Sequence, residues 1–157
     1  MEKQINNVTL SAIMRKKLSS SKKVSLDQML RIKELADAEI SVFFEQTIED
    51  GQYVVHDGYS QYKNRFPDSI GYECFCNEIS FHPIEEYGSF SQTVEYILDS
   101  ITKNLQRFKG RSFCIYLSMD DEADRITVHF HNYYNEFYFS EDIEDSNRPI
   151  LYVIIQT

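Results

Sequence analysis

The chain has 157 residues, of which 42% are hydrophobic and 14% aromatic, and this composition fits one globular domain rather than a disordered chain. No apolar run approaches the ~20 residues of a transmembrane helix, and the first residues lack the basic start and apolar block of a secretory signal. Three cysteines, Cys74, Cys76 and Cys114, are too few for a disulfide framework, so the sequence predicts a reduced, cytoplasmic protein.

The net charge of −9 is distributed unevenly along the chain. Residues 1–38 hold eight Lys/Arg against four Asp/Glu, whereas residues 39–157 hold eight against twenty-one. This acidic body argues against nucleic-acid binding, which needs a clustered positive surface, and favours a basic protein partner. Simple solubility would explain the same acidity.

The N-terminal third predicts two helices. Residues 8–18 form a short helix with Leu10, Ile13, Met14 and Leu18 on one face. A second helix begins after Ser25, whose capping-box partner is Gln28, and continues to about Thr47. Its residues at helical spacing are Leu26, Met29, Leu30, Lys33, Ala36, Ile40, Phe43 and Phe44. The alternative is a helix that ends at Ala38, followed by a hairpin that turns at residues 49–51.

The polar segment 58–71, which contains Pro67, predicts a surface loop. Residues 72–81 predict a strand that carries Tyr72, Cys74 and Cys76 on one side.

The strongest fold signal is a helix that leads directly into a strand, over residues 89–117. Its apolar residues recur every three or four positions and form one stripe: Phe90, Val94, Ile97, Leu98, Ile101, Leu105 and Phe108. Ser89 with Gln92 predicts a capping box, and Gly110 lies where a helix end favours positive φ. From Phe113 the period changes to two, which indicates a strand.

The C-terminal half predicts an antiparallel meander. Residues 113–118 and 125–133 form a hairpin around the acidic run 119–124, with Ile126, Val128 and Phe130 on one face and Thr127, His129 and His131 on the other. Residues 135–139 continue the meander. Residues 150–155 predict a central strand, apolar on both faces, and the N-terminal helices could cover its second face. We therefore expect one α+β domain over residues 1–157, with an antiparallel sheet packed on the long amphipathic helix and the N-terminal helices.

Two histidines and two cysteines have the spacing of paired ligands on a strand. His129 and His131 share a face, as do Cys74 and Cys76, so four side chains could form a zinc site if the strands were neighbours. One intervening residue is too few for the usual zinc cysteine pair, however, and buried cysteines with exposed histidines are the simpler interpretation.

Catalytic motifs are missing from the sequence. It contains no nucleophile elbow, phosphate-binding glycine loop or dinucleotide fingerprint. We therefore expect no enzyme activity, catalytic residue, metal or cofactor. General acid–base chemistry by His129 and His131 is the alternative.

Aromatic and histidine side chains are interleaved with two acidic runs in the C-terminal half, and aromatic anchors beside charges are typical of protein interfaces. The candidate partner-binding residues are Asp120, Asp121, Glu122, Asp124, Tyr116, His129, His131, Tyr133, Glu141, Asp142, Glu144 and Asp145.

The size, the acidity, the helix-to-meander unit 89–139 and the closing segment 149–155 together resemble bacterial toxin-immunity proteins, including those of contact-dependent growth inhibition. The resemblance implies a protein that binds and neutralises a cognate toxin, often a basic nuclease, by covering its active site or another essential surface. It implies neither a nucleic-acid nor a membrane partner. A small His-dependent hydrolase or metal-binding enzyme, and an acidic DNA mimic, are the alternative functions.

Overall fold

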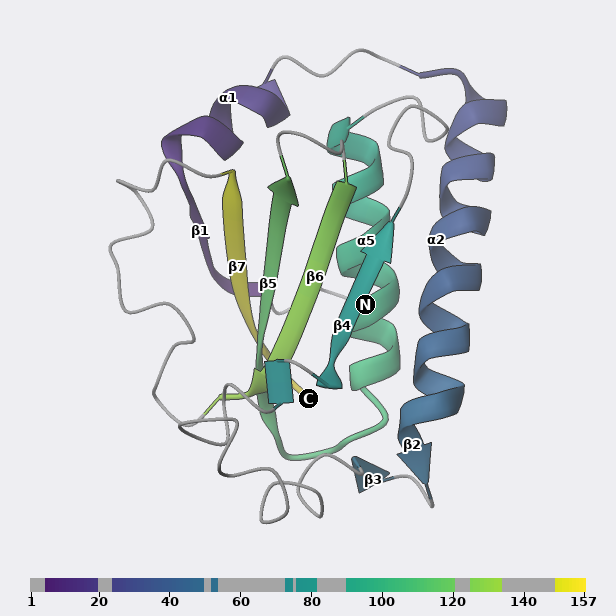
Figure 1. The fold of residues 1–157 in the computed structure, drawn as a ribbon, viewed down its shortest axis with the longest axis vertical. Helices are drawn as coiled ribbons and strands as arrows, with labels where there is room; N and C mark the ends of the chain where they lie inside the picture. The colour runs from purple at the N-terminus through teal and green to yellow at the C-terminus, as the bar shows by residue number, and fades with distance from the viewer. Residues whose placement is uncertain are drawn as a thin grey trace.

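The computed structural model describes residues 5–19, 24–49, 52–53, 73–74, 76–81, 90–120, 125–133 and 149–157 (Figure 1). The helices in these ranges are α1 (Ala12–Ser19), α2 (Leu26–Thr47) and α5 (Phe90–Leu105). The strands are β1 (Ile5–Leu10), β2 (Ile48–Glu49), β3 (Gln52–Tyr53), β4 (Glu78–Phe81), β5 (Ser112–Asp120), β6 (Arg125–Asn132) and β7 (Ile150–Gln156). The α+β class predicted from the sequence is confirmed.

Five of these strands form one antiparallel sheet in the order β1-β7-β5-β6-β4. Strands β5 and β6 form the predicted hairpin, paired from Phe113 opposite Asn132 to Asp120 opposite Arg125. The C-terminal strand β7 lies between β1 and β5, so an interior position of the sheet is filled by the last strand of the chain (Figure 1).

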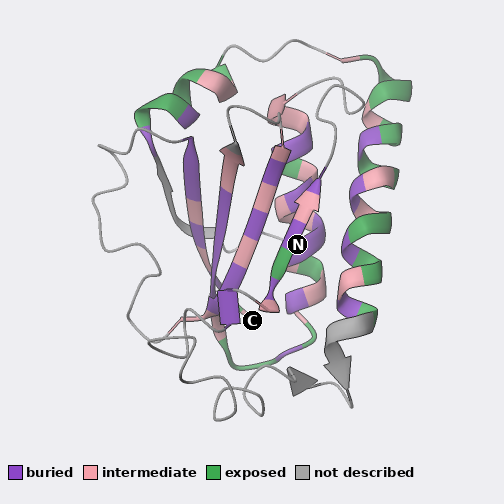
Figure 2. Cartoon of the chain, in the orientation of Figure 1, coloured by how far each residue is buried: buried purple, intermediate pink, exposed green. Residues whose placement is uncertain are grey.

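Helix α5 packs its predicted stripe against one face of this sheet. Val94, Ile97, Ile101 and Leu105 of the helix are buried. The sheet residues in the same core are Ile79, Phe81, Phe113, Ile115, Leu117, Ile126, Val128, Phe130, Leu151, Val153 and Ile155. Figure 2 shows how these buried positions alternate along the strands. Each large apolar side chain contributes about 1.5–3 kcal/mol when fully buried, so this layer is the main source of stability.

Helix α2 lies beside α5 and extends the same helical layer (Figure 1). Ile32, Ala36, Ile40 and Phe44 join the core, and the Phe44 ring stacks on that of Phe130, with centroids 5.6 Å apart. The expectation that the N-terminal helices cover the second face of the sheet is therefore wrong. One helix about 10 Å wide covers about two strands at a spacing of about 4.8 Å, so five strands need a second helix on the same face.

The start of α2 follows its sequence signal, whereas the end of α5 does not. Ser25 N donates to Gln28 Oε1 at 2.9 Å and Gln28 N donates to Ser25 Oγ at 3.3 Å, which confirms the capping box. The positive φ predicted for Gly110 is confirmed at 74°, but α5 ends at Leu105, and the Gly110 N–H donates to Thr157 O at 3.0 Å rather than to a carbonyl of α5, so Gly110 does not cap the helix. Ser89, the predicted cap of α5, lies outside the described residues.

The segment predicted as one helix over residues 8–18 changes from strand β1 to helix α1 at Ser11, so its first part was wrongly predicted. The buried Ser11 side chain makes this change possible. Its Oγ accepts hydrogen bonds from Met14 N at 3.2 Å and from Ile150 N at 3.0 Å, so one atom caps α1 and also joins the helix to β7.

Two further segments can be compared with their predictions, and one of them differs. Helix α2 reaches Thr47, as predicted, and not Ala38 as in the alternative, and β2 and β3 then pair over two residues each. Residues 73–74 and 76 are helical and the strand begins only at Glu78, so the strand predicted over 72–81 is wrong in its first half. The loop predicted at 58–71 and the strand predicted at 135–139 lie outside the described residues.

Candidate functional site

The side chains that point away from the helices form a polar face on the sheet. Because neighbouring residues of a strand point to opposite sides, the burial of the apolar set leaves the alternate positions on this second face. Tyr116 lies opposite His129 of β6 and Tyr152 of β7, and Cys114 lies opposite His131. We call the set Glu78, Cys114, Tyr116, His129, His131 and Tyr152 the polar face.

His131 and Tyr116 form the buried centre of the polar face, with 0% and 1% of their surfaces exposed. Their rings stack with centroids 5.5 Å apart. His131 Nδ1 lies 2.6 Å from Asn132 O and must donate, because a carbonyl oxygen only accepts. In the neutral ring Nε2 then accepts from the Tyr116 hydroxyl, 3.3 Å away. Both ring nitrogens of His131 are therefore occupied by protein groups.

Cys114 lies beside this pair and is also fully buried. Burial raises the pKa of its thiol from 9.0 to about 11, although a hydrogen bond with Tyr116 acts in the opposite direction. The thiol is therefore protonated at neutral pH. Because the thiolate is the reactive form of cysteine, Cys114 does not have the properties of a nucleophile.

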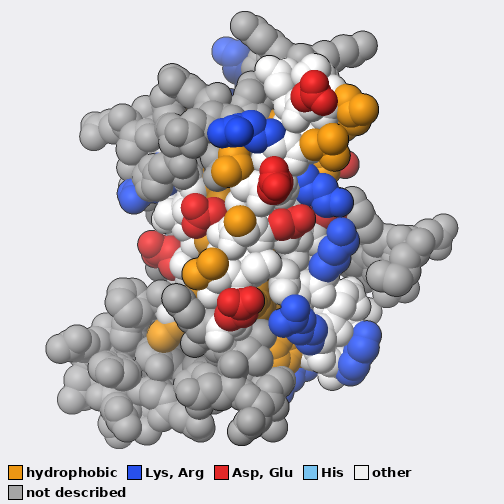
Figure 3. Space-filling view, turned by 90° about the vertical axis from the view of Figure 1, so that its right-hand side faces the viewer, with side chains coloured by type: hydrophobic (Ala, Val, Ile, Leu, Met, Phe, Trp, Pro, Cys, Tyr) orange, Lys and Arg blue, Asp and Glu red, His pale blue; other side chains and the backbone are white. Residues whose placement is uncertain are grey.

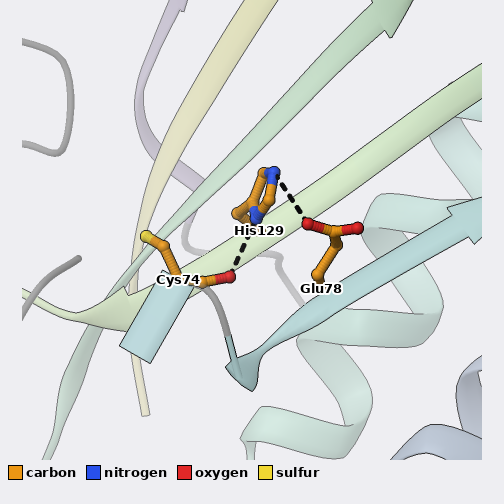
Figure 4. Close-up of polar contacts among 3 residues, drawn as sticks. All are labelled: Cys74, Glu78 and His129. Atoms are coloured by element: carbon orange, nitrogen blue, oxygen red, sulfur yellow. Dashed lines mark hydrogen bonds and ion pairs between the residues drawn. The ribbon is translucent and has the colours of Figure 1, made fainter. Parts of the chain in front are cut away.

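His129 lies at the edge of the polar face, between β4 and the turn that precedes it (Figure 4). Its Nδ1 donates to the Cys74 carbonyl oxygen at 2.9 Å, and its Nε2 lies 3.8 Å from Glu78 Oε2. The His129 side chain is 19% exposed and that of Glu78 49%. The carbonyl fixes the orientation of the ring, so that the second nitrogen points to the carboxylate.

A short segment around Glu73 attaches to the end of β6. The buried Glu73 accepts a hydrogen bond from Asn132 Nδ2 at 2.7 Å, and Asn77 Nδ2 donates to Phe130 O at 3.1 Å. The backbone N–H of Asn77 closes the turn by donating to Glu73 O at 2.7 Å. Sequence reasoning missed Glu73 and Asn77, because acidic and amide side chains are mostly exposed and carry no local signal of burial.

The four residues considered for zinc do not assemble. Cys74 meets His129 through its carbonyl oxygen, and its sulfur points away from the imidazole (Figure 4). Cys76 instead packs against the apolar core on the helical side. Within the described ranges, no group of three or more His, Cys, Asp or Glu side chains could hold a metal ion.

The candidate partner-binding residues fall into three groups. Tyr116 and His131 are buried, so assigning them to the surface was wrong. His129 and Tyr133 are half-buried, and Asp120 ends β5 opposite Arg125. The remaining acidic residues lie outside the described part of the chain: Asp121, Glu122, Asp124, Glu141, Asp142, Glu144 and Asp145.

Comparisons with known proteins identify a family for the chain. In the part of the chain that the structure describes, no helix has the length and apolar character that crossing a membrane requires. No curated protein and no solved structure matches the sequence. One family model matches all of residues 1–157, and the chain belongs to that family, the Uncharacterized protein PM0498 family.

Proposed function

We propose that this chain is a cytoplasmic immunity-type inhibitor, which binds a cationic toxin domain one-to-one and blocks it. The feature that carries the proposal is the acidic run that connects β5 and β6 in the sequence. Asp120 and Arg125 face each other in the last pair of the ladder, and the residues that connect them include Asp121, Glu122 and Asp124. Four carboxylates thus occupy five consecutive positions.

The base of this hairpin is well anchored. Leu117 on β5 and Val128 on β6 pair directly, and both are 0% exposed in the core. Like charges at neighbouring positions of the chain repel each other in the free protein, and a cationic partner relieves the repulsion on binding. Complementary fields also speed association and select the partner. The position of the acidic run therefore fits recognition of a basic protein.

A hydrolase that uses the two histidines receives less support from the same geometry. General acid–base catalysis needs a ring nitrogen within reach of the substrate. Both nitrogens of the buried His131 bond to protein groups, and those of His129 face the Cys74 carbonyl and the Glu78 carboxylate. We therefore infer that His129 and His131 stabilise the sheet and do not act in catalysis.

The experiment is to co-express the tagged full chain with the product of the adjacent upstream reading frame, and to measure complex formation and growth. The double charge reversal D121K/E122K should weaken binding about tenfold or more and reduce its dependence on salt. The matched control E95K/D99K makes the same charge change on α5 and should bind as the unmodified protein does. Equal affinity of both variants and the unmodified protein would count against the hairpin end as the contact.

A further inference from the structure

Helix α2 has two rows of side chains with a spacing of four residues. The inner row, Ile32, Ala36, Ile40 and Phe44, is at most 1% exposed and packs in the core. We define the outer ridge as the row Leu26, Leu30, Glu34, Ala38 and Val42, and every one of its residues is exposed. Rows of this spacing are the ridges with which helices pack into grooves of other helices.

The outer ridge is apolar at four of its five positions. Leu26 is 70% exposed, Leu30 58% and Val42 54%, and these are three of the four large hydrophobic residues that are exposed in the described part of the chain. From Leu26 to Val42 the ridge extends about 24 Å along the helix. Sequence spacing alone grouped Leu26 and Leu30 with the inner row, whereas in the structure both side chains are exposed to solvent. Exposed apolar surface of this extent is typical of binding sites.

The charges on α2 indicate what kind of surface would cover the ridge. The helix carries five acidic residues, Asp27, Glu34, Asp37, Glu39 and Glu45, against the basic pair Arg31 and Lys33. Figure 3 shows this side of the molecule, where hydrophobic side chains are interspersed with acidic and basic ones. A second copy of α2 would add like charge, whereas a partner with basic residues beside an apolar groove complements both features.

We propose that the outer ridge of α2 docks into an apolar groove bordered by Lys and Arg side chains on the partner protein. This inference rests on the proposed function, because it assigns a second contact to the same cationic partner. The N-terminal end of α2, the C-terminal end of β5 and the N-terminal end of β6 lie at the same end of the molecule in Figure 1, and the acidic run connects these two strand ends in the sequence. The hairpin would then supply charge, and the ridge the apolar anchors of a helix-in-groove contact.

The test uses the full chain and the product of the adjacent upstream reading frame, with affinity measured by titration calorimetry. The variant L30Q/V42Q replaces two exposed ridge residues and should keep the helix, because glutamine has good helix propensity. Its expected effect is a loss of affinity of about tenfold or more, with the melting temperature unchanged. The control I13Q makes a similar change at Ile13 on α1, which is 36% exposed and lies off the ridge, and should bind as the unmodified protein does.

Each other outcome contradicts the inference in a distinguishable way. A complex that forms equally well with L30Q/V42Q would exclude the ridge but leave the proposed function standing. No complex with the unmodified protein would remove the proposed function and the ridge contact together. A homodimer of the unmodified protein that L30Q/V42Q converts to a monomer would show that a second copy of the chain covers the ridge.

Discussion

Replacing Ser11 by alanine removes one atom that joins β1, α1 and β7. Ser11 Oγ accepts from Met14 N at 3.2 Å and from Ile150 N at 3.0 Å, and the residue is 0% exposed. Loss of a helix N-cap typically costs ~1 kcal/mol, and a second buried N–H left without an acceptor adds ~1–3 kcal/mol. The variant should therefore lower the free energy of unfolding by about 2–4 kcal/mol.

Urea unfolding followed by circular dichroism measures this change, and amide hydrogen exchange localises it. The Met14 and Ile150 amides should exchange faster in the variant if the junction opens. Ser19→Ala on the same helix is the matched control, because the Ser19 hydroxyl donates to Lys16 O on the exposed side, and its effect should stay within about 0.5 kcal/mol. A loss below about 1 kcal/mol for Ser11→Ala would refute the reasoning, since one of the two amides would then have another acceptor.

Two further predictions concern the polar face. Tyr116→Phe removes the donor to His131 Nε2 and should lower the free energy of unfolding by about 1–2 kcal/mol in urea titrations, and an unchanged midpoint and slope would show that the hydroxyl contributes nothing there. The raised pKa of Cys114 means that the folded chain keeps its thiol proton where the unfolded chain loses it, so this group's stabilising contribution is complete below pH 9.0 and declines as the pH rises through about 11. Cys114→Ala should flatten that part of the stability profile, and identical slopes for the two proteins would contradict the assignment.

The elements that follow from local pattern were predictable. The spacing of apolar residues predicts which side of each element is buried. This holds for the stripe from Val94 to Leu105 and for the alternation of Ile126, Val128 and Phe130. Ser25 marks the start of α2 because its role depends on chemistry within a few residues.

The elements that depend on distant partners were not predictable. Strand β1 pairs with β7 from the far end of the chain, and no local signal in residues 5–10 records that pairing. Periodicity placed Tyr116 and His131 on the second face of the sheet but could not say that these two side chains are buried. The same limit applies to α2, where spacing could not separate the outer ridge from the core.

The central claim is that the chain acts by binding a cationic protein, and co-purification tests it most directly. The tagged full chain is expressed with the product of the adjacent upstream reading frame, and the eluate is analysed by size-exclusion chromatography with light scattering while growth is followed. The account predicts a one-to-one complex and restored growth. Separate elution of the two proteins, with growth still inhibited, would contradict it.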